Sequence, residues 1–403
     1  MLTSLALIFL LSLLLGGIAQ KLKLPSLLGI LLAGMILSPY ALNLLDGSIL
    51  MISPDLRKLA LVIILTRAGL SLDLKSLKKV GRPAILMCFV PASFEIIGVI
   101  LLAPALLKVS ILEAAIMGAV IAAVSPAVVV PRMLRIMEEG YGKKHSIPEL
   151  ILAGASVDDV FVIVLFTAFT SLAQGEGVSV FAFVGIPISI VLGIVVGIIT
   201  GIVLNWFFQK FHYRDSVKIL ILLSISFLLL ELETRMEGFL PMSGLLAIMS
   251  LGITLYQTYP KLSKRLSAKY NKLWVAAEIV LFALVGASVD LSYAVKAGGI
   301  VILLVLGALF FRMLGVLLCL TKTPLTRKER IFCMLAYTPK ATVQAAIGGI
   351  PLSMGLPCGE IVLTVAVISI LITAPLGAIF VDRTYRKLLT EKEGFGKSIV
   401  TDD

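Results

Sequence analysis

Charged residues are scarce in this sequence. They make up 15% of its 403 residues, whereas 59% are hydrophobic and the mean hydropathy is +1.07. This composition excludes an ordinary soluble domain and is typical of a polytopic helical membrane protein. Long polar stretches are also lacking, apart from short loops and a C-terminal tail that starts near Asp382. No segment is therefore left for a separate catalytic module.

Cysteine and histidine are too few and too scattered for a metal or redox site. The four cysteines lie in or at the ends of apolar runs without ligand-like spacing, so we expect small core residues, no disulfide, no structural zinc and no cofactor. The two histidines, His145 and His212, fall in predicted loops. An intramembrane protease needs a serine with a histidine, or two aspartates on separate helices. The sequence therefore predicts that the protein is not an enzyme.

Thirteen apolar windows, each of about 20 residues, predict an all-α membrane protein with 13 transmembrane helices. The first, Leu2 to Ala19, lacks the basic start and cleavage site of a secretory signal, so we expect it to be retained. The approximate centres are Phe9, Leu32, Leu61, Glu95, Ser125, Asp159, Gly193, Ser224, Met249, Leu281, Leu306, Lys340 and Leu371.

The lysines and arginines fall mostly on one set of alternate loops. Because such loops face the cytoplasm, we expect the N-terminus outside and the C-terminus inside, in a bacterial-type inner (plasma) membrane. The net charge of +11 follows from this bias and does not indicate nucleic acid. The opposite side carries only Arg57, Lys58, Lys108, Arg235 and Lys296.

Two pairs of segments repeat with the same separation along the chain, which we call the repeat offset. The string AGLSLDL at 68–74 matches VGASVDL at 285–291, and SLLGILLAGMIL at 26–37 matches SGLLAIMSLGIT at 243–254. An offset of seven spans makes the two halves antiparallel, which is typical of secondary transporters. The seventh span, Val178 to about Phe208, is then expected to be a linker helix.

Two adjacent carboxylates, Asp158 and Asp159, lie near the middle of the apolar run 146–173. A charge at the centre of a membrane helix costs from about 2.5 to 17 kcal/mol, so such residues usually mark an ion or proton pathway. The alternative is an acid pair that basic neighbours neutralise to hold helices together. Adjacent residues point about 100° apart on a helix, which disfavours that alternative.

Proline interrupts one span in each half at mid-membrane. Pro126 and Pro339 are expected to break their helices, because proline lacks an N–H and clashes with the preceding turn; a plain kink is the alternative. Broken helices expose carbonyls and helix ends that can bind ions. Thr342 belongs to the second break.

Three further ionisable residues sit at mid-depth. Glu95 and Arg312 are separated by the repeat offset, so they occupy equivalent positions in the two halves, and we expect a salt bridge with a structural or gating role. Lys340 follows the second break, where it is expected to neutralise the acid pair and the partial charges of the broken helix.

Three strings, SVDDV, SPAVVVPRM and YTPKATVQAAIGGIP, resemble the cation:proton antiporter superfamily. They fit the double-aspartate sodium/proton antiporters, and PKATVQAAIG with a membrane Arg and Glu looks most like the NHA branch. The resemblance implies an NhaA-like fold with an inverted repeat and two broken crossing helices, in a homodimer with an elevator mechanism. Asp159 would be the principal ion and proton carboxylate, with Asp158 as its partner and Ser125 completing the site, so that both aspartates bind the transient monovalent cation.

The same resemblance implies a division into domains. A dimerisation domain would comprise residues 1–80 (helices 1–3) and 213–293 (helices 8–10), and a core transport domain residues 81–175 (helices 4–6) and 294–388 (helices 11–13). Helix 7, residues 176–212, would link them, and residues 389–403 would form a cytoplasmic tail. In some relatives a lysine on the helix before the second break pairs with the first aspartate; here that helix carries Arg312.

The predicted function is exchange of Na⁺ or Li⁺ for H⁺ across a lipid bilayer. A potassium/proton antiporter and an ion-coupled organic-anion symporter of similar architecture are the alternatives within transport. A receptor or scaffold is the alternative outside it, and would tolerate neutral residues in place of both aspartates. The simplest cycle exchanges one cation for one proton, whereas protonation of both aspartates or deprotonation of Lys340 would permit two protons per cation.

Overall fold

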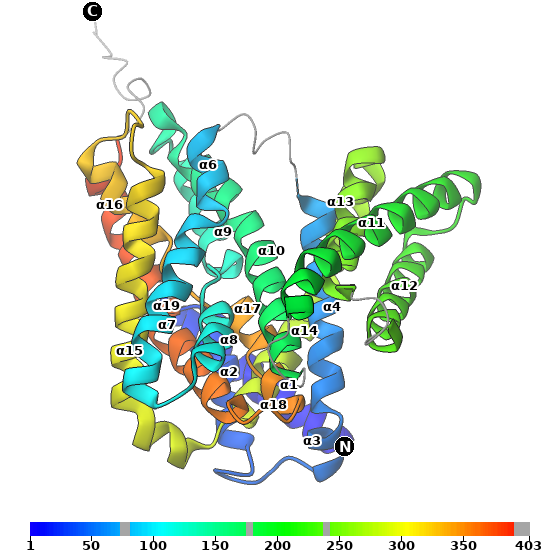
Figure 1. Cartoon of the computed structure of the whole chain (residues 1–403), viewed down its shortest axis with the longest axis horizontal. Helices are drawn as coiled ribbons and strands as arrows, with labels where there is room; N and C mark the ends of the chain where they lie inside the picture. The colour runs from blue at the N-terminus through cyan, green and yellow to red at the C-terminus, as the bar shows by residue number, and fades with distance from the viewer. Residues whose placement is uncertain (73–80, 175–179, 237–241, 391–403) are drawn as a thin grey trace, which may run out of the picture.

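The computed structural model describes residues 1–72, 81–174, 180–236 and 242–390, and throughout these ranges the regular structure is helical (Figure 1). In chain order the elements are α1 (Leu2–Lys21), α2 (Ser26–Leu37), α3 (Gly47–Met51), α4 (Ser53–Ser71), α6 (Arg82–Met87), α7 (Val90–Leu107), α8 (Ile111–Ile121), α9 (Pro126–Glu138), η1 (Lys143–His145), α10 (Ile147–Gln174), α11 (Val180–Lys210), α12 (Asp215–Met236), α13 (Gly244–Thr258), α14 (Pro260–Ala287), α15 (Leu291–Cys319), α16 (Arg327–Ala336), α17 (Thr342–Ile347), α18 (Ile350–Ser353) and α19 (Gly359–Leu388).

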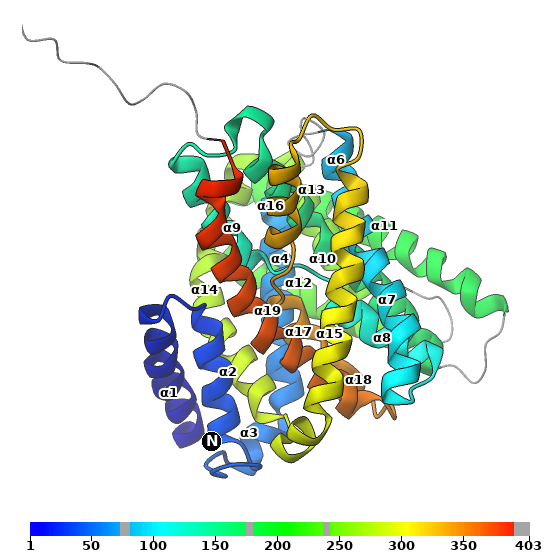
Figure 2. The same cartoon turned by 90° about the vertical axis from the view of Figure 1, so that its left-hand side faces the viewer.

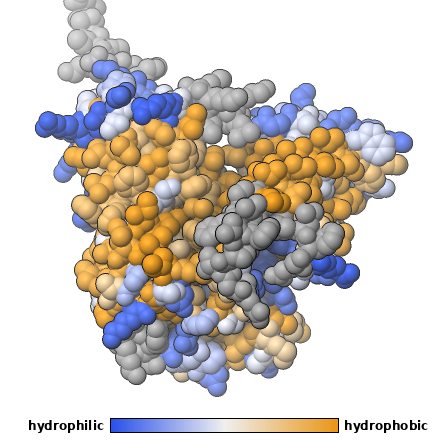
Figure 3. Space-filling view, viewed as in Figure 1, coloured by the Kyte–Doolittle hydropathy of each residue, from blue (hydrophilic) through white to orange (hydrophobic). Residues whose placement is uncertain are grey.

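The surface carries a broad hydrophobic band bordered by hydrophilic residues at both ends of the bundle (Figure 3). All thirteen predicted centres lie on these helices or at breaks between consecutive ones. By length and composition, eight helices or consecutive helix pairs of the described residues can cross a membrane. The all-helical membrane fold is therefore confirmed, while the count of thirteen spans stays a prediction.

The repeat is visible in how the helices pack. The two members of one repeated pair are α2 and α13, and the members of the other are α4 and α14; α2 packs on α14, and α13 packs on α4. Glycine permits both close approaches. A Cβ added at Gly69 would lie 3.0 Å from the Cα of Gly252, and one at Gly286 would collide with the Leu31 carbonyl oxygen. Asp73, in the first repeated string, lies outside the described residues.

Substituting Gly69 by alanine is expected to destabilise the protein by about 1–3 kcal/mol, because the added methyl group forces α4 and α13 apart. Thermal unfolding of the detergent-solubilised protein measures the loss. Gly47→Ala is the matched control, since nothing lies within 4 Å of a Cβ at that position. Equal melting temperatures for the two variants would contradict the close helix contact.

The span predicted around Glu95 is interrupted, because α6 ends at Met87 and α7 begins at Val90. Pro91 explains the break: it has no N–H to donate to the carbonyl of Met87, four residues earlier. The Tyr337 hydroxyl donates to that carbonyl instead, at 3.4 Å. The break therefore ties α6 to the loop after α16.

The repeat partners α7 and α15 lie side by side, as Figures 1 and 2 both show. In the same part of the molecule, α10 packs against α8 and α16, and α8 and α16 each pack against α19. All four cysteines are buried, as expected for small core residues. The part of the molecule formed by α7–α10 and α15–α19 contains both predicted breaks and all five mid-membrane charges.

Candidate functional site

The two broken helices meet at their breaks. The first break separates α8 from α9, which begins with Pro126, and the second separates α16 from α17, which begins with Thr342. Proline suits a first helical position, where no N–H is needed. The Ser125 N–H donates to the Pro339 carbonyl oxygen at 2.8 Å. Both predicted breaks are therefore present, and a backbone hydrogen bond joins them.

The end of α8 carries carbonyl groups that its own helix leaves unpaired, and positive or amide groups from the other half approach them. Lys340 Nζ donates to the Ile121 oxygen at 2.5 Å, and Arg312 Nη1 donates to the Ala122 oxygen. Gln344 Nε2 donates to the Ala123 oxygen at 2.9 Å. Cations are favoured at a helix C-terminus because its partial charge is negative.

Glu95 lies between two cations. Its carboxylate is 2.9 Å from Arg312 Nη1 and 2.7 Å from Lys340 Nζ, and all three side chains are buried. The predicted ion pair of Glu95 with Arg312 is therefore present. Lys340 contacts the broken helix, as expected, and within the described residues its ion pair is with Glu95. Neutralisation of the acid pair by Lys340 stays a prediction.

Arg312 is the cation that reaches the acid pair. Its Nη2 is 2.8 Å from Asp158 Oδ2, its Nε donates to the Tyr337 carbonyl at 2.6 Å, and its guanidinium lies 5.3 Å from the centre of the Tyr337 ring. The fork of an arginine can bridge two carboxylates, which a lysine cannot do with the same geometry. Arg312 thus joins Glu95 on α7 to Asp158 on α10.

The two aspartates differ in their environment. Asp158 Oδ2 accepts hydrogen bonds from Arg312 and from the Val124 N–H, both at 2.8 Å. Asp159 is 9% exposed, and its buried Oδ1 has no hydrogen-bond partner. Asp158 is therefore ion-paired within the protein, whereas Asp159 has no ion pair among the described residues.

Several other oxygens near the breaks are buried without a hydrogen-bond partner: Asp158 Oδ1, Ser125 Oγ and Thr342 Oγ1. Ser125 and Thr342 are themselves separated by the repeat offset, so each half supplies one hydroxyl directly at its break. Carboxylate and hydroxyl oxygens are the ligands that hard cations prefer. A partly desolvated alkali cation or a proton is thus the kind of ligand that this arrangement suits.

Sequence reasoning missed four contributors to this region. Gln344 is fully buried and donates hydrogen bonds to two carbonyls of the first break. A polar amide within an apolar string was the sequence signal that could have identified it. The Val124 N–H and the Tyr337 carbonyl are backbone groups, which no side-chain pattern reveals. The hydroxyl of Thr373 on α19 also accepts a hydrogen bond from the Lys340 N–H at 2.9 Å.

The sequence matches the family described as "Sodium/hydrogen exchanger, transmembrane" over residues 7–387. It is 33% identical to human sodium/hydrogen exchanger 9B2 over 385 residues, which cover 92% of this chain and 71% of that one. Identity to human sodium/hydrogen exchanger 9B1 is 31%, over 91% of this chain and 73% of the relative.

Among solved structures, the sodium proton antiporter MjNhaP1 from Methanocaldococcus jannaschii at pH 8 superposes with a TM-score of 0.83, covering 95% of this chain and 97% of that one at 22% identity. This likeness shows the fold, and the family match extends over nearly the whole chain. The antiporter fold and the superfamily predicted from the three strings are both confirmed, and the chain belongs to the sodium/hydrogen exchanger family.

Proposed function

We propose that this protein exchanges sodium or lithium for protons at Asp159. One observation carries the proposal: Asp159 is a buried carboxylate without a hydrogen bond to one of its oxygens, next to an aspartate whose charge Arg312 already compensates. A buried, uncompensated carboxylate requires a proton or a cation. A proton or a cation can neutralise the Asp159 carboxylate, but the two cannot occupy it at the same time.

The mechanism is competition between the two ions. A bound Na⁺ would take Asp159 and the unpartnered oxygens of Asp158 and Ser125 as ligands; a proton would bind Asp159 alone. Either occupant removes the net charge from the core, which lowers the desolvation cost of moving the site across the membrane. A core with an empty site keeps its net charge and would not cross the membrane. The site would therefore cross only with a cation or a proton bound, which couples the two fluxes in opposite directions.

Movement of the site would follow the domain division that the family resemblance implies. The core would comprise α6–α10 and α15–α19, and the dimerisation domain α1–α4 and α12–α14, with α11 as the linker. The division is supported by glycine-mediated backbone contacts within the second group and by ion pairs that join helices of the first. A homodimer and an elevator motion of the core relative to it are part of this proposal, as is the orientation with the C-terminus inside.

Charge counting favours an electroneutral cycle. Glu95, Asp158 and Asp159 carry three negative charges, and Arg312 and Lys340 carry two positive ones, so a single cation or proton neutralises the cluster. The contacts support constant charge on four of these groups, since Glu95 is paired with Lys340 and Arg312, and Arg312 with Asp158. Only Asp159 remains to change occupancy.

We therefore expect one cation to be exchanged for one proton, without net charge movement. In proteoliposomes, an imposed membrane potential without an ion gradient should drive no Na⁺ accumulation, and the flux-reversal point should not shift with potential. A potential-dependent reversal point would instead indicate two protons per cation, as protonation of both aspartates or deprotonation of Lys340 would produce.

Cation choice separates the proposal from its rivals in the same fold. Exchange is assayed with Na⁺, Li⁺ and K⁺ under a fixed pH gradient. Dissipation of the gradient by Na⁺ or Li⁺ supports the proposal; dissipation by K⁺ alone would make the protein a potassium/proton antiporter. Flux that requires an organic anion would support the symporter alternative.

A further inference from the structure

Arg57, on α4, is a buried cation that forms no ion pair with the described residues. Its side chain is 8% exposed, yet no carboxylate of the described residues lies within ion-pair distance of it. Its only hydrogen bond there is a long one, from Nε to the Ser53 carbonyl at 3.4 Å. Nη1 is buried and has no partner. The guanidinium is always charged, with five N–H donors, so the described residues satisfy only a small part of its bonding capacity.

The other buried cations of the described residues are compensated. Arg312 and Lys340 pair with carboxylates, and Lys218 lies 5.4 Å from the ring centre of Phe208, at cation–π distance. Burying a charge without a partner is costly, and buried charges are normally paired. Among the buried cations of the described residues, Arg57 is therefore the one that lacks a compensating partner.

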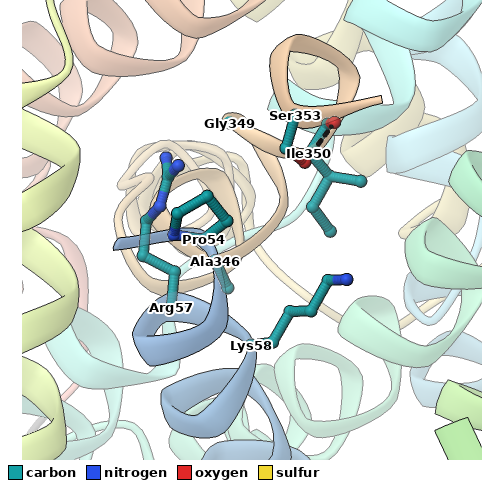
Figure 4. Close-up of a pocket in the computed structure, with 7 residues that line it drawn as sticks. All are labelled: Pro54, Arg57, Lys58, Ala346, Gly349, Ile350 and Ser353. Atoms are coloured by element: carbon teal, nitrogen blue, oxygen red, sulfur yellow. Dashed lines mark hydrogen bonds between the residues drawn. The ribbon is translucent and has the colours of Figure 1, made fainter. Parts of the chain in front are cut away.

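A cavity adjoins the guanidinium (Figure 4). It is lined from α4 by Pro54, Arg57 and Lys58, and from the segment after the second break by Ala346, Gly349, Ile350 and Ser353. The guanidinium lies directly against Gly349, where an added Cβ would collide with Nη1. The Ser353 hydroxyl donates to the Ile350 carbonyl at 2.8 Å. Arg57 and Lys58 are the charged groups that face the cavity.

The size of the cavity selects the class of ligand. Its volume is about 10 Å³, roughly what a single water-sized group occupies. A phosphate or an organic carboxylate would not lie wholly inside this volume, and the two positive side chains disfavour a cation. A monatomic anion meets both conditions.

We propose that a chloride ion binds between Arg57 and the segment 346–353. The ion would accept hydrogen bonds from the free N–H groups of Arg57, with Lys58 at the rim adding positive potential. Because α4 and segment 346–353 belong to different parts of the fold, the bound ion would hold them together. This inference is independent of the proposed cation exchange.

Direct binding of ³⁶Cl⁻ to the purified full-length protein in detergent tests the proposal, at fixed Na⁺ concentration and with gluconate as the balancing anion. We expect saturable binding of one chloride per chain, displaced by bromide and not by gluconate. In Arg57→Gln, affinity should fall at least tenfold. Arg67→Gln is the matched control from the same helix, because the charge of Arg67 interacts with Glu278; its chloride affinity should be unchanged.

A second variant keeps the arginine. Gly349→Ala places a methyl group where Nη1 now lies, so it should also weaken chloride binding at least tenfold. If Arg57→Gln does not fold, the chloride affinity of Gly349→Ala alone tests the proposal. The proposal is overturned if the wild-type protein shows no saturable chloride binding, or if a folded Arg57→Gln or Gly349→Ala variant binds chloride as tightly as the wild type.

Discussion

Asp159→Asn is expected to abolish sodium-driven proton flux while leaving a folded protein. Asparagine has nearly the same shape and no charge, so the side chain still fits its buried position but can neither exchange a proton nor neutralise a cation. Removing the charge also removes an uncompensated buried carboxylate, so thermal stability should be equal to or higher than that of the wild type. Flux is measured in proteoliposomes under a pH gradient, with melting temperature measured in parallel.

Asp55→Asn is the matched control, since Asp55 lies exposed in the first turn of α4 and should leave flux unchanged. Retention of substantial cation-driven proton flux in Asp159→Asn would reject Asp159 as the shared carboxylate. If flux also persists when Asp158 is replaced by Asn, the aspartate pair as a whole would be rejected as the ion site, whereas a wild-type protein without any cation-driven proton flux would support a receptor or scaffold.

Glu95→Gln should produce the largest loss of stability, about 3–5 kcal/mol, because removing one partner of a buried ion pair leaves a charge uncompensated. Here two cations lose their shared partner, since Glu95 contacts both Arg312 and Lys340. Arg312→Gln should cost a similar amount by stranding Asp158. The double variant should lose less than the sum of the two single losses, as interacting residues do in a mutant cycle.

Glu231→Gln provides the contrast. Glu231 pairs with Arg235 on an exposed surface of α12, where such a bridge contributes at most about 1 kcal/mol. Unfolding of all four variants is followed by heat in the same detergent. Strictly additive losses for Glu95 and Arg312 would contradict direct coupling, whatever their individual sizes.

The fold was predictable because its strongest determinants are local or repeated. The length of the apolar runs predicts the helices, and proline predicts both breaks. The repeat offset identified Glu95 and Arg312 as equivalent positions before any contact was visible. The break before α7 was missed even though Pro91 is in the sequence, because a proline near a span centre does not reveal whether a helix kinks or ends.

The candidate site was less predictable because its geometry depends on backbone groups and on which cation reaches which anion. Charge alone suggested that Lys340 would face the aspartates, yet helix positions place Arg312 there and Lys340 on Glu95. That Arg57 has no ion pair with the described residues could not be predicted either. A lone arginine near a helix end usually extends its charge to the membrane surface, and only the contact with Gly349 distinguishes it.

The Glu95–Arg312 pair also bears on the ancestry of the chain. Two identical halves would place the same residue at both positions, and two carboxylates or two guanidiniums would repel each other at the contact of α7 with α15. A duplicated ancestor with perfect symmetry could not contain this bridge, so opposite charges arose only after the halves had diverged. The aspartates lead to the same conclusion, since the repeat offset assigns Asp158 and Asp159 to Pro375 and Leu376 in the second half. An exact duplication would have had two acidic pairs or none, so the single pair per chain is itself a mark of lost symmetry.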